Sequence, residues 1–367
     1  MSAELGGIEK SLITFLDFLV KMNCEVDLLL WKKKGELLGQ IPHQVKLIDS
    51  PSAGNLKTIL KNKRVIDVYK YSMLKFFSKI GKPWKSFPKL KDTYDIAVSY
   101  TQDGYSPYYV IDNVKASKKI LWYHHGEYVY DSKKWKKDIN YYECFNNIVT
   151  VSESNKKMLE IYFKDIADKI SVIQNLLDEK NIIKESEEKC IFFDKFSGCK
   201  ITTVGRLSVE KGQLETLALC KKLKDEQFDF KWCFVGDGPL RNQCETLVKE
   251  YSLENHCFFV GAKKNPYKYV ANSDIYVQLS KVEADPVTIQ EALILKKLII
   301  GSSIPAIQEA LFYGKLGKIC YSEEDAISSI KQLNIDVNLQ KEYLKNIEQY
   351  ESRNKKIESL LYNILFL

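Results

Sequence analysis

The segment Ile201-Thr202-Thr203-Val204-Gly205-Arg206-Leu207 decides the fold. Its first four residues form a short run rich in β-branched side chains, which ends at a glycine and is followed by a helical pattern. Short runs of this kind that alternate with helical segments are typical of a parallel sheet in an α/β protein. We therefore expect any ligand to bind outside the carboxyl ends of such strands.

The same alternation continues along most of the chain. In the first half, the pattern predicts strands over 24–30, 45–48, 95–99, 119–123, 147–152 and 170–174, and helices over 8–22 and 153–163. In the second half, it predicts strands over 201–204, 230–235, 257–260, 274–278 and 298–301. We expect two doubly wound, Rossmann-like domains over 1–178 and 200–336, a charged linker over 179–199, and a helical segment over 337–367.

Composition excludes several classes of protein. The 367 residues are 45% hydrophobic and 28% charged, which is ordinary for a folded protein and unlike a disordered one. No stretch is long and apolar enough for a membrane span, and the start lacks the basic region of a signal peptide. The nine cysteines form no metal-ligand pattern and favour reduced thiols, so we expect a cytoplasmic protein without a metal site.

The net charge of +7 belongs to the first half of the chain, where residues 1–178 hold 28 Lys and Arg against 21 Asp and Glu. Most of the excess lies between Lys57 and Lys91, where eleven basic residues accompany one acid. Large apolar residues, including Phe76, Ile80 and Trp84, stand among them. This block predicts contact with anionic lipid at the inner face of the cell membrane. No nucleic-acid motif accompanies the charge, so nucleic acid is not an expected partner.

The segment Glu283-Ala284-Asp285-Pro286-Val287-Thr288-Ile289-Gln290-Glu291 carries two carboxylates with seven residues between them, just after an apolar strand. Pro286 suits the first turn of a helix, so Glu283 would lie in the loop and Glu291 inside the helix. The amides of residues 287–289 would then point out of the helix start, where anions bind. A phosphate held between carboxylates, which accept hydrogen bonds from sugar hydroxyls, would suit a nucleotide sugar.

Two cations are predicted near the same edge of the second sheet. Arg206 follows the strand over 201–204, and Lys211 stands five positions later. Together they would neutralise a diphosphate leaving group without a metal. Gly236 and Gly238 form a glycine turn after the strand over 230–235. Because the turn lacks the third glycine of the dinucleotide fingerprint and its acidic partner, a nicotinamide cofactor is not expected.

These motifs, in this order, resemble the retaining GT-B glycosyltransferases of family 4, also called glycosyltransferase group 1, of the bacterial surface-polysaccharide type. The resemblance covers about residues 200–320 and rests on Val204-Gly205-Arg206-Leu207, Gly236-Asp237-Gly238-Pro239-Leu240, Gly261 with Asn265-Pro266-Tyr267, Ser273-Asp274, and Glu283 with Glu291-Ala292-Leu293. It implies the GT-B fold, in which two Rossmann-like domains face a cleft.

The resemblance also implies roles for single residues. Arg206 and Lys211 would bind the donor diphosphate, Glu291 the nucleotide ribose, and Glu283 the transferring sugar. Asp285 departs from the commoner family sequence and would lie near the sugar hydroxyls. The remaining donor-site positions implied in this way are Gly236, Gly238, Ala262, Val287 and Thr288, the last two through their amides.

The first half shares fewer sequence motifs with the family. Gly6 and Gly7 resemble the glycine loop that opens the first helix, where bare backbone can approach the diphosphate and the acceptor. His125, within Trp122-Tyr123-His124-His125-Gly126-Glu127, resembles the strand-end His motif and would contact the transferring sugar. An isolated His is more often structural, and two at one strand end favour function. The family opens with a strand before its glycine loop, whereas only residues 1–5 precede it here, so we expect the first domain to lack that strand.

The sequence therefore predicts a retaining glycosyltransferase that moves a sugar from a nucleotide diphosphate, with a UDP-sugar favoured. The expected acceptor is a glycan or a polyprenyl-diphosphate-linked glycan in capsule or other surface-polysaccharide synthesis. The proposed catalytic residues are His125, Arg206, Lys211 and Glu283, and no metal or further cofactor is expected. Two alternatives remain open, a catalytically inactive GT-B-like binding protein and a nucleotide-sugar epimerase on the same fold.

Overall fold

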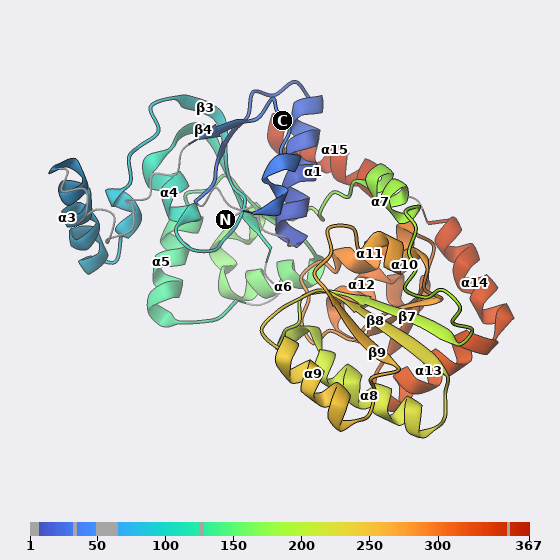
Figure 1. Cartoon of the computed structure of the whole chain (residues 1–367). Coiled ribbons are helices and arrows are strands. Elements are labelled where there is room, and N and C mark those ends of the chain that lie inside the picture. Colours follow the sequence, from blue (N-terminus) through green and yellow to red (C-terminus); the bar gives the residue numbers. More distant parts are fainter. Residues whose placement is uncertain (1–6, 32–34, 49–64, 125–127, 351–352) are drawn as a thin grey trace. The chain divides into compact units, whose positions relative to one another are not determined.

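A computed structural model of the chain describes residues 7–31, 35–48, 65–124, 128–350 and 353–367. It divides into two compact units (Figure 1). The first comprises residues 1–176 together with 356–367, and the second comprises residues 177–355. Each unit contains parallel strands alternating with helices, as the sequence pattern predicts.

The second unit is built on one six-stranded sheet with the order β12-β11-β10-β7-β8-β9, in which every pair is parallel. Its strands are β7 Cys199–Val204, β8 Phe230–Val235, β9 Cys257–Gly261, β10 Ile275–Gln278, β11 Leu298–Ser302 and β12 Lys318–Cys320. The first five confirm the predicted strands to within a few residues. The short strand β12 was not predicted, because its three residues carry too weak a pattern.

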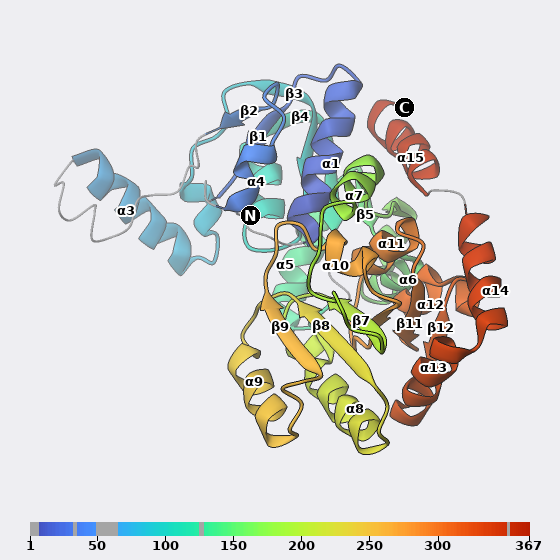
Figure 2. The same ribbon diagram turned by 45° about the vertical axis from the view of Figure 1, so that its right-hand side comes forward.

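Helices cover both faces of this sheet (Figure 2). One face packs against α8 Gln213–Asp225, α9 Arg241–Glu250 and α13 Glu323–Ile335, and the other against α10 Tyr267–Ala271, α11 Val287–Ile294 and α12 Pro305–Ala310. The unit also holds α7 Glu179–Ser186, α14 Val337–Glu348, and the 3-10 turns η4 Val209–Lys211 and η5 Phe312–Gly314. Because both faces are buried, the central strands are mostly apolar, as in parallel sheets generally.

In the first unit, the described strands form two separate sheets. The smaller sheet pairs β1 Asp27–Leu29 with β2 Lys46–Ile48, and the larger has the order β3-β4-β5-β6. The larger sheet consists of β3 Thr93–Ser99, β4 Lys115–Tyr123, β5 Asn147–Thr150 and β6 Ile170–Val172. All strand pairs within each sheet are parallel. The sequence predicted these six strands but not the division between β1 and β3.

Most helices of the first unit lie between its strands in the chain, whereas α1 precedes them and α15 follows the second unit. They are α1 Gly7–Lys21, α3 Val65–Lys79, α4 Ser106–Asn113, α5 Ser132–Tyr142, α6 Glu153–Tyr162 and α15 Asn354–Phe366, with 3-10 turns η1 Glu36–Gln40, η2 Pro83–Ser86 and η3 Lys164–Lys169. The ends of α1 and α6 agree with the predicted helices to within one residue. An N-cap side chain begins α6, since Ser152 Oγ accepts from the Asn155 amide at 3.3 Å.

Two predicted boundaries differ from the structure. The segment 179–199 is no irregular linker throughout, because its first eight residues form α7, which packs in the second unit against α10 and α11. The segment 337–367 forms two helices, and most of α15 belongs to the first unit. The helical period of a sequence shows which residues form the apolar face of a helix. It does not show which of the two units that face packs against.

Other sequence expectations concern the surface and the cysteines. Trp84, predicted within the lipid-contacting block, is fully buried, and its Nε1 donates to Asp112 Oδ2 at 2.7 Å. Phe76 and Ile80 of the same block are 58% and 53% exposed. All nine cysteines are free, and seven of them are buried. Among the described residues, none of the helices has the length and hydropathy needed to cross a bilayer.

Candidate functional site

The chain reverses its direction across the second sheet between β7 and β10. From β7 the strands proceed outward through β8 to β9, and β10 then returns to the other side of β7. In open parallel sheets, such a switch point leaves a crevice at the carboxyl ends of the two strands, where ligands bind. The loops that follow β7 and β10 lie at this crevice. They contain Arg206 and Lys211 from the first loop and Glu283 and Asp285 from the second.

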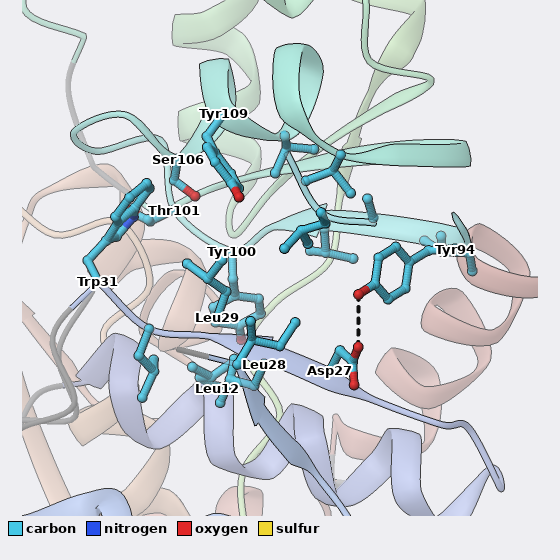
Figure 3. Close-up of a pocket in the computed structure, with 18 residues that line it drawn as sticks. Leu12, Asp27, Leu28, Leu29, Trp31, Tyr94, Tyr100, Thr101, Ser106 and Tyr109 are labelled. Atoms are coloured by element: carbon cyan, nitrogen blue, oxygen red, sulfur yellow. Dashed lines mark hydrogen bonds between the residues drawn. The ribbon is translucent and has the colours of Figure 1, made fainter. Parts of the chain in front are cut away.

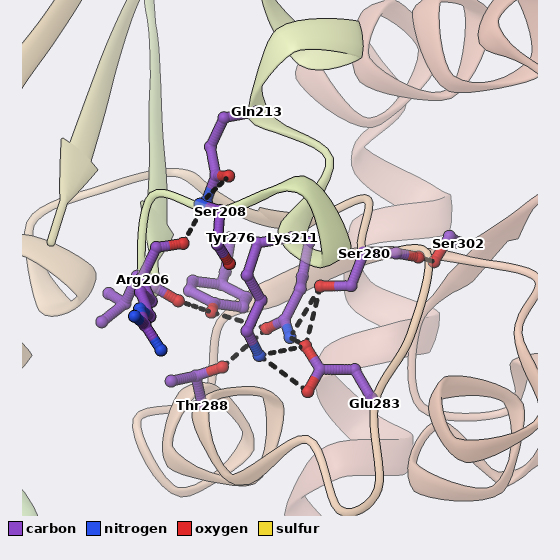
Figure 4. A network of polar contacts seen from close by, with 11 residues as sticks. Arg206, Ser208, Lys211, Gln213, Tyr276, Ser280, Glu283, Thr288 and Ser302 are labelled. Atoms are coloured by element: carbon purple, nitrogen blue, oxygen red, sulfur yellow. Dashed lines mark hydrogen bonds and ion pairs between the residues drawn. The ribbon is translucent and has the colours of Figure 1, made fainter. Parts of the chain in front are cut away.

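An ion pair joins the two loops (Figure 4). Lys211 Nζ donates to both carboxylate oxygens of Glu283, at 2.6 and 2.8 Å. The Glu283 side chain is 7% exposed and that of Lys211 is 27% exposed, so the pair lies at the edge of the interior. The sequence placed both residues at the site but predicted separate roles for them. The structure shows that the charge of Lys211 is largely compensated by its neighbour.

Further donors hold the Glu283 carboxylate in place. Gln278 Nε2 and Ser280 Oγ donate to Glu283 Oε1, at 2.6 and 2.7 Å. Gln278 Oε1 in turn accepts from Thr288 Oγ1 at 2.6 Å and from Tyr276 OH at 2.8 Å. The network therefore ties the carboxylate to the end of β10 and to the first turn of α11 (Figure 4). A carboxylate that accepts hydrogen bonds from this many donors is fixed in direction.

The start of α11 lies beside this network, since Thr288 belongs to both. Of the three amides predicted to be available, those of Val287 and Ile289 donate to the carbonyls of Asp285 and Pro286, at 2.8 and 2.9 Å. The expectation is therefore wrong for these two amides in this structure. Only the Thr288 amide makes no hydrogen bond to another described residue. A helix start with a remaining N–H group attracts negative charge through the helix dipole.

Arg206 supplies an exposed cation at the same crevice. Its side chain is on the surface, and no carboxylate among the described residues forms an ion pair with it. Its backbone is fixed, because Gln213 Nε2 donates to the Arg206 carbonyl at 2.8 Å and Gln213 Oε1 accepts from the Ser208 amide at 3.2 Å. A fixed backbone with an exposed guanidinium is suited to binding phosphate, which guanidinium groups contact in a bidentate manner.

Glu291 is buried inside α11, at 6% exposure. Its Oε1 accepts a hydrogen bond from Tyr267 OH, at the start of α10, over 3.0 Å. Burial and the neighbouring carboxylate raise the pKa of Tyr267 far above its ordinary range, so the phenol remains a donor. The sequence singled out Glu291, and it quoted Tyr267 within a motif without giving it a role.

Asp285 has a partner that the sequence did not suggest. Its two carboxylate oxygens accept from Arg353 Nη1 and Nη2, at 3.0 and 3.1 Å. Both side chains are buried, at 3% and 7% exposure. The pair fixes the loop that carries Glu283 to the segment after α14. A contact between Asp285 and a sugar hydroxyl stays a prediction, and the carboxylate would have to share its oxygens with the guanidinium.

The glycine turn after β8 packs tightly against the loop after β7. A Cβ atom at Gly236 would collide with the carbonyl oxygen of Gly205, and one at Gly238 with that of Leu207. The φ of Gly236 is +152°, in the region that side chains rarely adopt. Close packing of the two loops therefore requires glycine at both positions, in addition to the predicted contact with a ligand. Ala262, just after β9, is exposed.

The predicted first-domain residues are only partly described. Gly7 is the first residue of α1, and a Cβ there would meet no atom within 4 Å. Gly6 and His125 lie outside the described residues. The adjacent His124 is buried, with its ring 4.8 Å from that of Tyr100, centroid to centroid.

Sequence reasoning missed Gln278, Tyr276 and Arg353. Gln278 and Tyr276 are inward-facing polar groups on β10, and a polar residue at the carboxyl end of an apolar strand is the signal that could have identified Gln278. Arg353 is far from the site in sequence and has no local signal.

Comparison with known proteins finds similarity to glycosyltransferases, mainly over the second unit. The family described as Glycosyl transferases group 1 matches residues 197–352, a range that contains Arg206, Lys211, Glu283 and Glu291 but ends one residue before Arg353. An uncharacterized glycosyltransferase of Methanocaldococcus jannaschii is 29% identical over 168 residues, which are 44% of this chain and 41% of that protein. The Campylobacter jejuni N-acetylgalactosamine-N,N'-diacetylbacillosaminyl-diphospho-undecaprenol 4-alpha-N-acetylgalactosaminyltransferase is 26% identical over 53% of each chain. This chain thus spans about half the length of the curated relatives that it matches.

Similarity to solved structures extends over the whole chain. The Anabaena HepE protein, solved in complex with UDP-glucose, superposes with a TM-score of 0.70, covering 99% of this chain and 98% of that one at 15% identity. At this identity the likeness concerns the fold. Residues 197–352 are thus similar to the glycosyl transferases group 1, and the α/β fold of the chain is the GT-B fold seen in solved glycosyltransferases.

Proposed function

We propose that this protein is a retaining glycosyltransferase that moves a sugar from a nucleotide diphosphate, preferably UDP, to a glycan or lipid-linked glycan in cell-surface polysaccharide synthesis. The observation that carries the proposal is the Lys211–Glu283 pair at the switch point of the second sheet, beside the start of α11 and the exposed Arg206. Arg206 and the start of α11 offer a position for the diphosphate of a nucleotide sugar. The fixed carboxylate of Glu283 offers a hydrogen-bond acceptor for its sugar.

The chemistry follows from these charges. As the bond between sugar and phosphate lengthens, negative charge grows on the departing diphosphate and positive charge on the sugar ring. Arg206, the Lys211 ammonium and the Thr288 amide would meet the first charge, and Glu283 would face the second. No side chain has to act as a strong base, because the departing phosphate oxygen can accept the proton of the acceptor hydroxyl.

Buried Glu291 would bind the ribose of the donor. A carboxylate accepts hydrogen bonds from two neighbouring hydroxyls, and the Tyr267 hydroxyl orients it from the opposite side. The complex of the Anabaena neighbour with UDP-glucose supports UDP as the first nucleotide to test. The printed name of the Campylobacter relative, which contains a diphospho-undecaprenol-linked saccharide, supports a polyprenyl-diphosphate-linked acceptor.

A thermal-shift screen with UDP-, GDP- and ADP-sugars tests the donor. A ligand at 100 times its Kd stabilises the folded state by about 2.7 kcal/mol, which is easily measured. We expect UDP-sugars to raise the Tm of the wild-type chain and of Lys221→Ala, a control on the exposed face of α8. Arg206→Ala should respond much less. No shift with any nucleotide sugar would contradict the proposal.

Turnover assays separate the alternatives. With a polyprenyl-diphosphate-linked saccharide present, a transferase forms a new glycosidic bond whose anomeric configuration matches the donor, as proton NMR can establish. An epimerase would alter the donor sugar without any acceptor. An inactive binding protein would give the thermal shift and no product.

We also propose peripheral contact with the inner membrane face through residues 57–91. Phe76 and Ile80 are exposed on and just after α3, next to Lys75, Lys79 and Lys82. Co-sedimentation with phosphatidylglycerol vesicles should exceed that with phosphatidylcholine, and the double variant Phe76→Ser, Ile80→Ser should bind less. Equal sedimentation with both lipids would remove this part of the proposal.

A further inference from the structure

Arg353 and Asn354, two neighbouring residues at the start of α15, each contact a distant part of the second unit. Arg353 Nη1 and Nη2 donate to the two carboxylate oxygens of Asp285, at 3.0 and 3.1 Å. Asn354 Nδ2 donates to the Leu177 carbonyl at 2.6 Å, and its Oδ1 accepts from the Leu177 amide at 3.2 Å. A two-point contact fixes the direction of a partner as well as its distance.

Asp285 lies on the short stretch of chain between Glu283 and α11. It follows Glu283 by two positions, and Pro286 alone separates it from Val287, the first residue of α11. The Val287 amide donates to the Asp285 carbonyl at 2.8 Å, so the Asp285 backbone is also tied to the first turn of this helix. Because the stretch is short and includes a proline with a restricted φ, a shift of Asp285 is transmitted to Glu283.

The two ion pairs of this loop differ in rigidity. Lys211 reaches the Glu283 carboxylate with a flexible four-carbon side chain, which can follow the carboxylate if the loop shifts. The guanidinium of Arg353 is planar and presents its donors in a rigid fork, and its partner Asp285 has a short side chain. Lys211 thus balances the charge of Glu283, whereas the Arg353–Asp285 pair fixes the backbone of the loop.

Stability alone is a poor reason for a buried ion pair at this place. The side chains of Arg353 and Asp285 are 7% and 3% exposed, so both charges have lost most of their contact with water. Replacement of such a pair by uncharged residues is often neutral or stabilising, because the cost of desolvation disappears. What the pair provides at this loop is a contact with a defined direction.

Asn354 supports the second carboxylate of the site in a similar way. Leu177, which it holds, packs in one apolar cluster with Tyr267 and Val287. The Tyr267 hydroxyl in turn donates to Glu291 at 3.0 Å. The start of α15 therefore supports the surroundings of both carboxylates that are proposed to contact the donor.

We propose that Arg353 is a positioning residue for sugar transfer: it holds Asp285, and through Asp285 the backbone that carries Glu283. This inference rests on the proposed function, since that function places the Glu283 carboxylate against the transferring sugar. Arg353 acts through Asp285 and makes no contact with the donor. The pair carries no net charge, so its loss should lower kcat while the KM for the donor and the Kd for UDP change little.

A double variant tests this role without leaving a charge buried alone. In Asp285→Asn, Arg353→Gln both residues are neutral and can still form a hydrogen bond, so the chain should fold. We expect its kcat to fall by about 10- to 100-fold, since a displacement of about 1 Å at a reacting group can cost this much. Arg353→Lys, which retains the cation, should keep more of the activity. Glu348→Gln, which breaks an exposed ion pair with Lys296, is the control and should leave kcat unchanged.

Repeating the substitutions in a Glu283→Gln background distinguishes positioning from general damage. If Arg353 acts through the Glu283 carboxylate, the Asp285→Asn, Arg353→Gln change should lower kcat much less when that carboxylate is already absent. An equal fall of kcat in both backgrounds would show a general effect on the second unit and would overturn the proposal.

Hydrogen exchange provides a readout that does not depend on turnover. In the Asp285→Asn, Arg353→Gln variant, the amides of Val287 and Ile289 should exchange faster, because the first turn of α11 has lost its support. The amides of β7 should exchange as in the wild type. Unchanged exchange together with unchanged kcat would exclude the positioning role and leave the proposed function intact. A wild-type chain that transfers no sugar would contradict the proposed function instead.

Discussion

Lys211 and Glu283 form a two-point ion pair, with Nζ 2.6 and 2.8 Å from the carboxylate oxygens, although 72 positions separate them in the sequence. The pair joins the loop after β7 to the loop after β10 at the switch point of the sheet. Part of the positive charge available to a diphosphate is therefore balanced before any ligand binds. Arg206 supplies an exposed cation at the same crevice.

Glu283→Gln should separate binding from turnover. The substitution removes one negative charge next to the proposed phosphate position and leaves the Lys211 ammonium uncompensated. We expect UDP to bind more tightly by isothermal calorimetry, because a phosphate then meets an additional net positive charge. Turnover should fall by about 100-fold or more, since the carboxylate facing the sugar ring is lost. Weaker UDP binding in this variant would contradict the assigned charge balance.

Lys211→Ala should lower turnover and also destabilise the second unit, because it leaves the buried Glu283 carboxylate without its cation. The lost interaction with the departing diphosphate corresponds to about 3 kcal/mol, or roughly 100-fold in kcat. Lys221→Ala is the matched control, because it removes an exposed ion pair with Asp225 on α8 and should change neither turnover nor Tm. Near-normal kcat in Lys211→Ala would remove Lys211 from the mechanism.

Asp285→Ala should destabilise the second unit strongly. It leaves the Arg353 guanidinium buried without its two-point carboxylate partner, and breaking one side of a buried ion pair costs about 3–5 kcal/mol. Glu348→Gln breaks the Lys296–Glu348 pair, whose side chains are 62% and 60% exposed, and should cost less than about 1 kcal/mol. Urea denaturation compares the two. Similar midpoints would show that the Asp285–Arg353 pair contributes little.

Gly236→Ala should be poorly tolerated. The new Cβ would collide with the Gly205 carbonyl oxygen, and the φ of +152° is unfavourable for alanine. We expect a loss of about 1–3 kcal/mol and weaker binding of nucleotide sugar, because the loop carrying Arg206 must move. Gly39→Ala, where a Cβ would meet no atom within 4 Å, provides the control and should leave both quantities unchanged.

Alkaline pH should destabilise the first unit. Burial raises the pKa of Tyr109 from 10.0 to about 12, and burial together with the hydrogen bond to Asp27 raises that of Tyr94 to the same value. Between pH 10 and about pH 12, the two phenols lose their protons in the unfolded chain but keep them in the folded chain. The free energy of unfolding therefore falls as pH rises from 10 to 12.

The variant Tyr94→Phe isolates one of these groups. It should be less stable than the wild type at pH 8, because the bond to Asp27 beside the cavity between β1 and β3 is lost (Figure 3). Between pH 10 and 12, the free energy of unfolding of this variant should fall less steeply with pH than that of the wild type, because one phenol fewer titrates. A series of urea titrations at different pH values measures this slope. An unchanged slope would show that Tyr94 titrates alike in the folded and unfolded chains.

Much of the fold could be predicted from the sequence because strand and helix periods are local properties. All eleven predicted strands are present, and Glu283 and Glu291 lie in the loop and the helix where their spacing places them. The short strand β12 and the helix α7 were missed, since a few residues give no clear period. Trp84 was predicted to lie on the lipid-contacting surface, but it is buried. A local count of lysines and aromatic residues does not show which ring enters the core.

The sequence by itself determined the α/β class, the positions of the strands along the chain, and the two loops that bear Arg206, Lys211 and Glu283. These follow from patterns within a few residues of each other. Tertiary structure alone decided that Lys211 and Glu283 neutralise each other, that Asp285 holds Arg353, and that β1 and β3 face a shared cavity. Each of these depends on groups far apart in the chain that packing brings within a few ångströms, and short-range periodicity carries no information about such encounters.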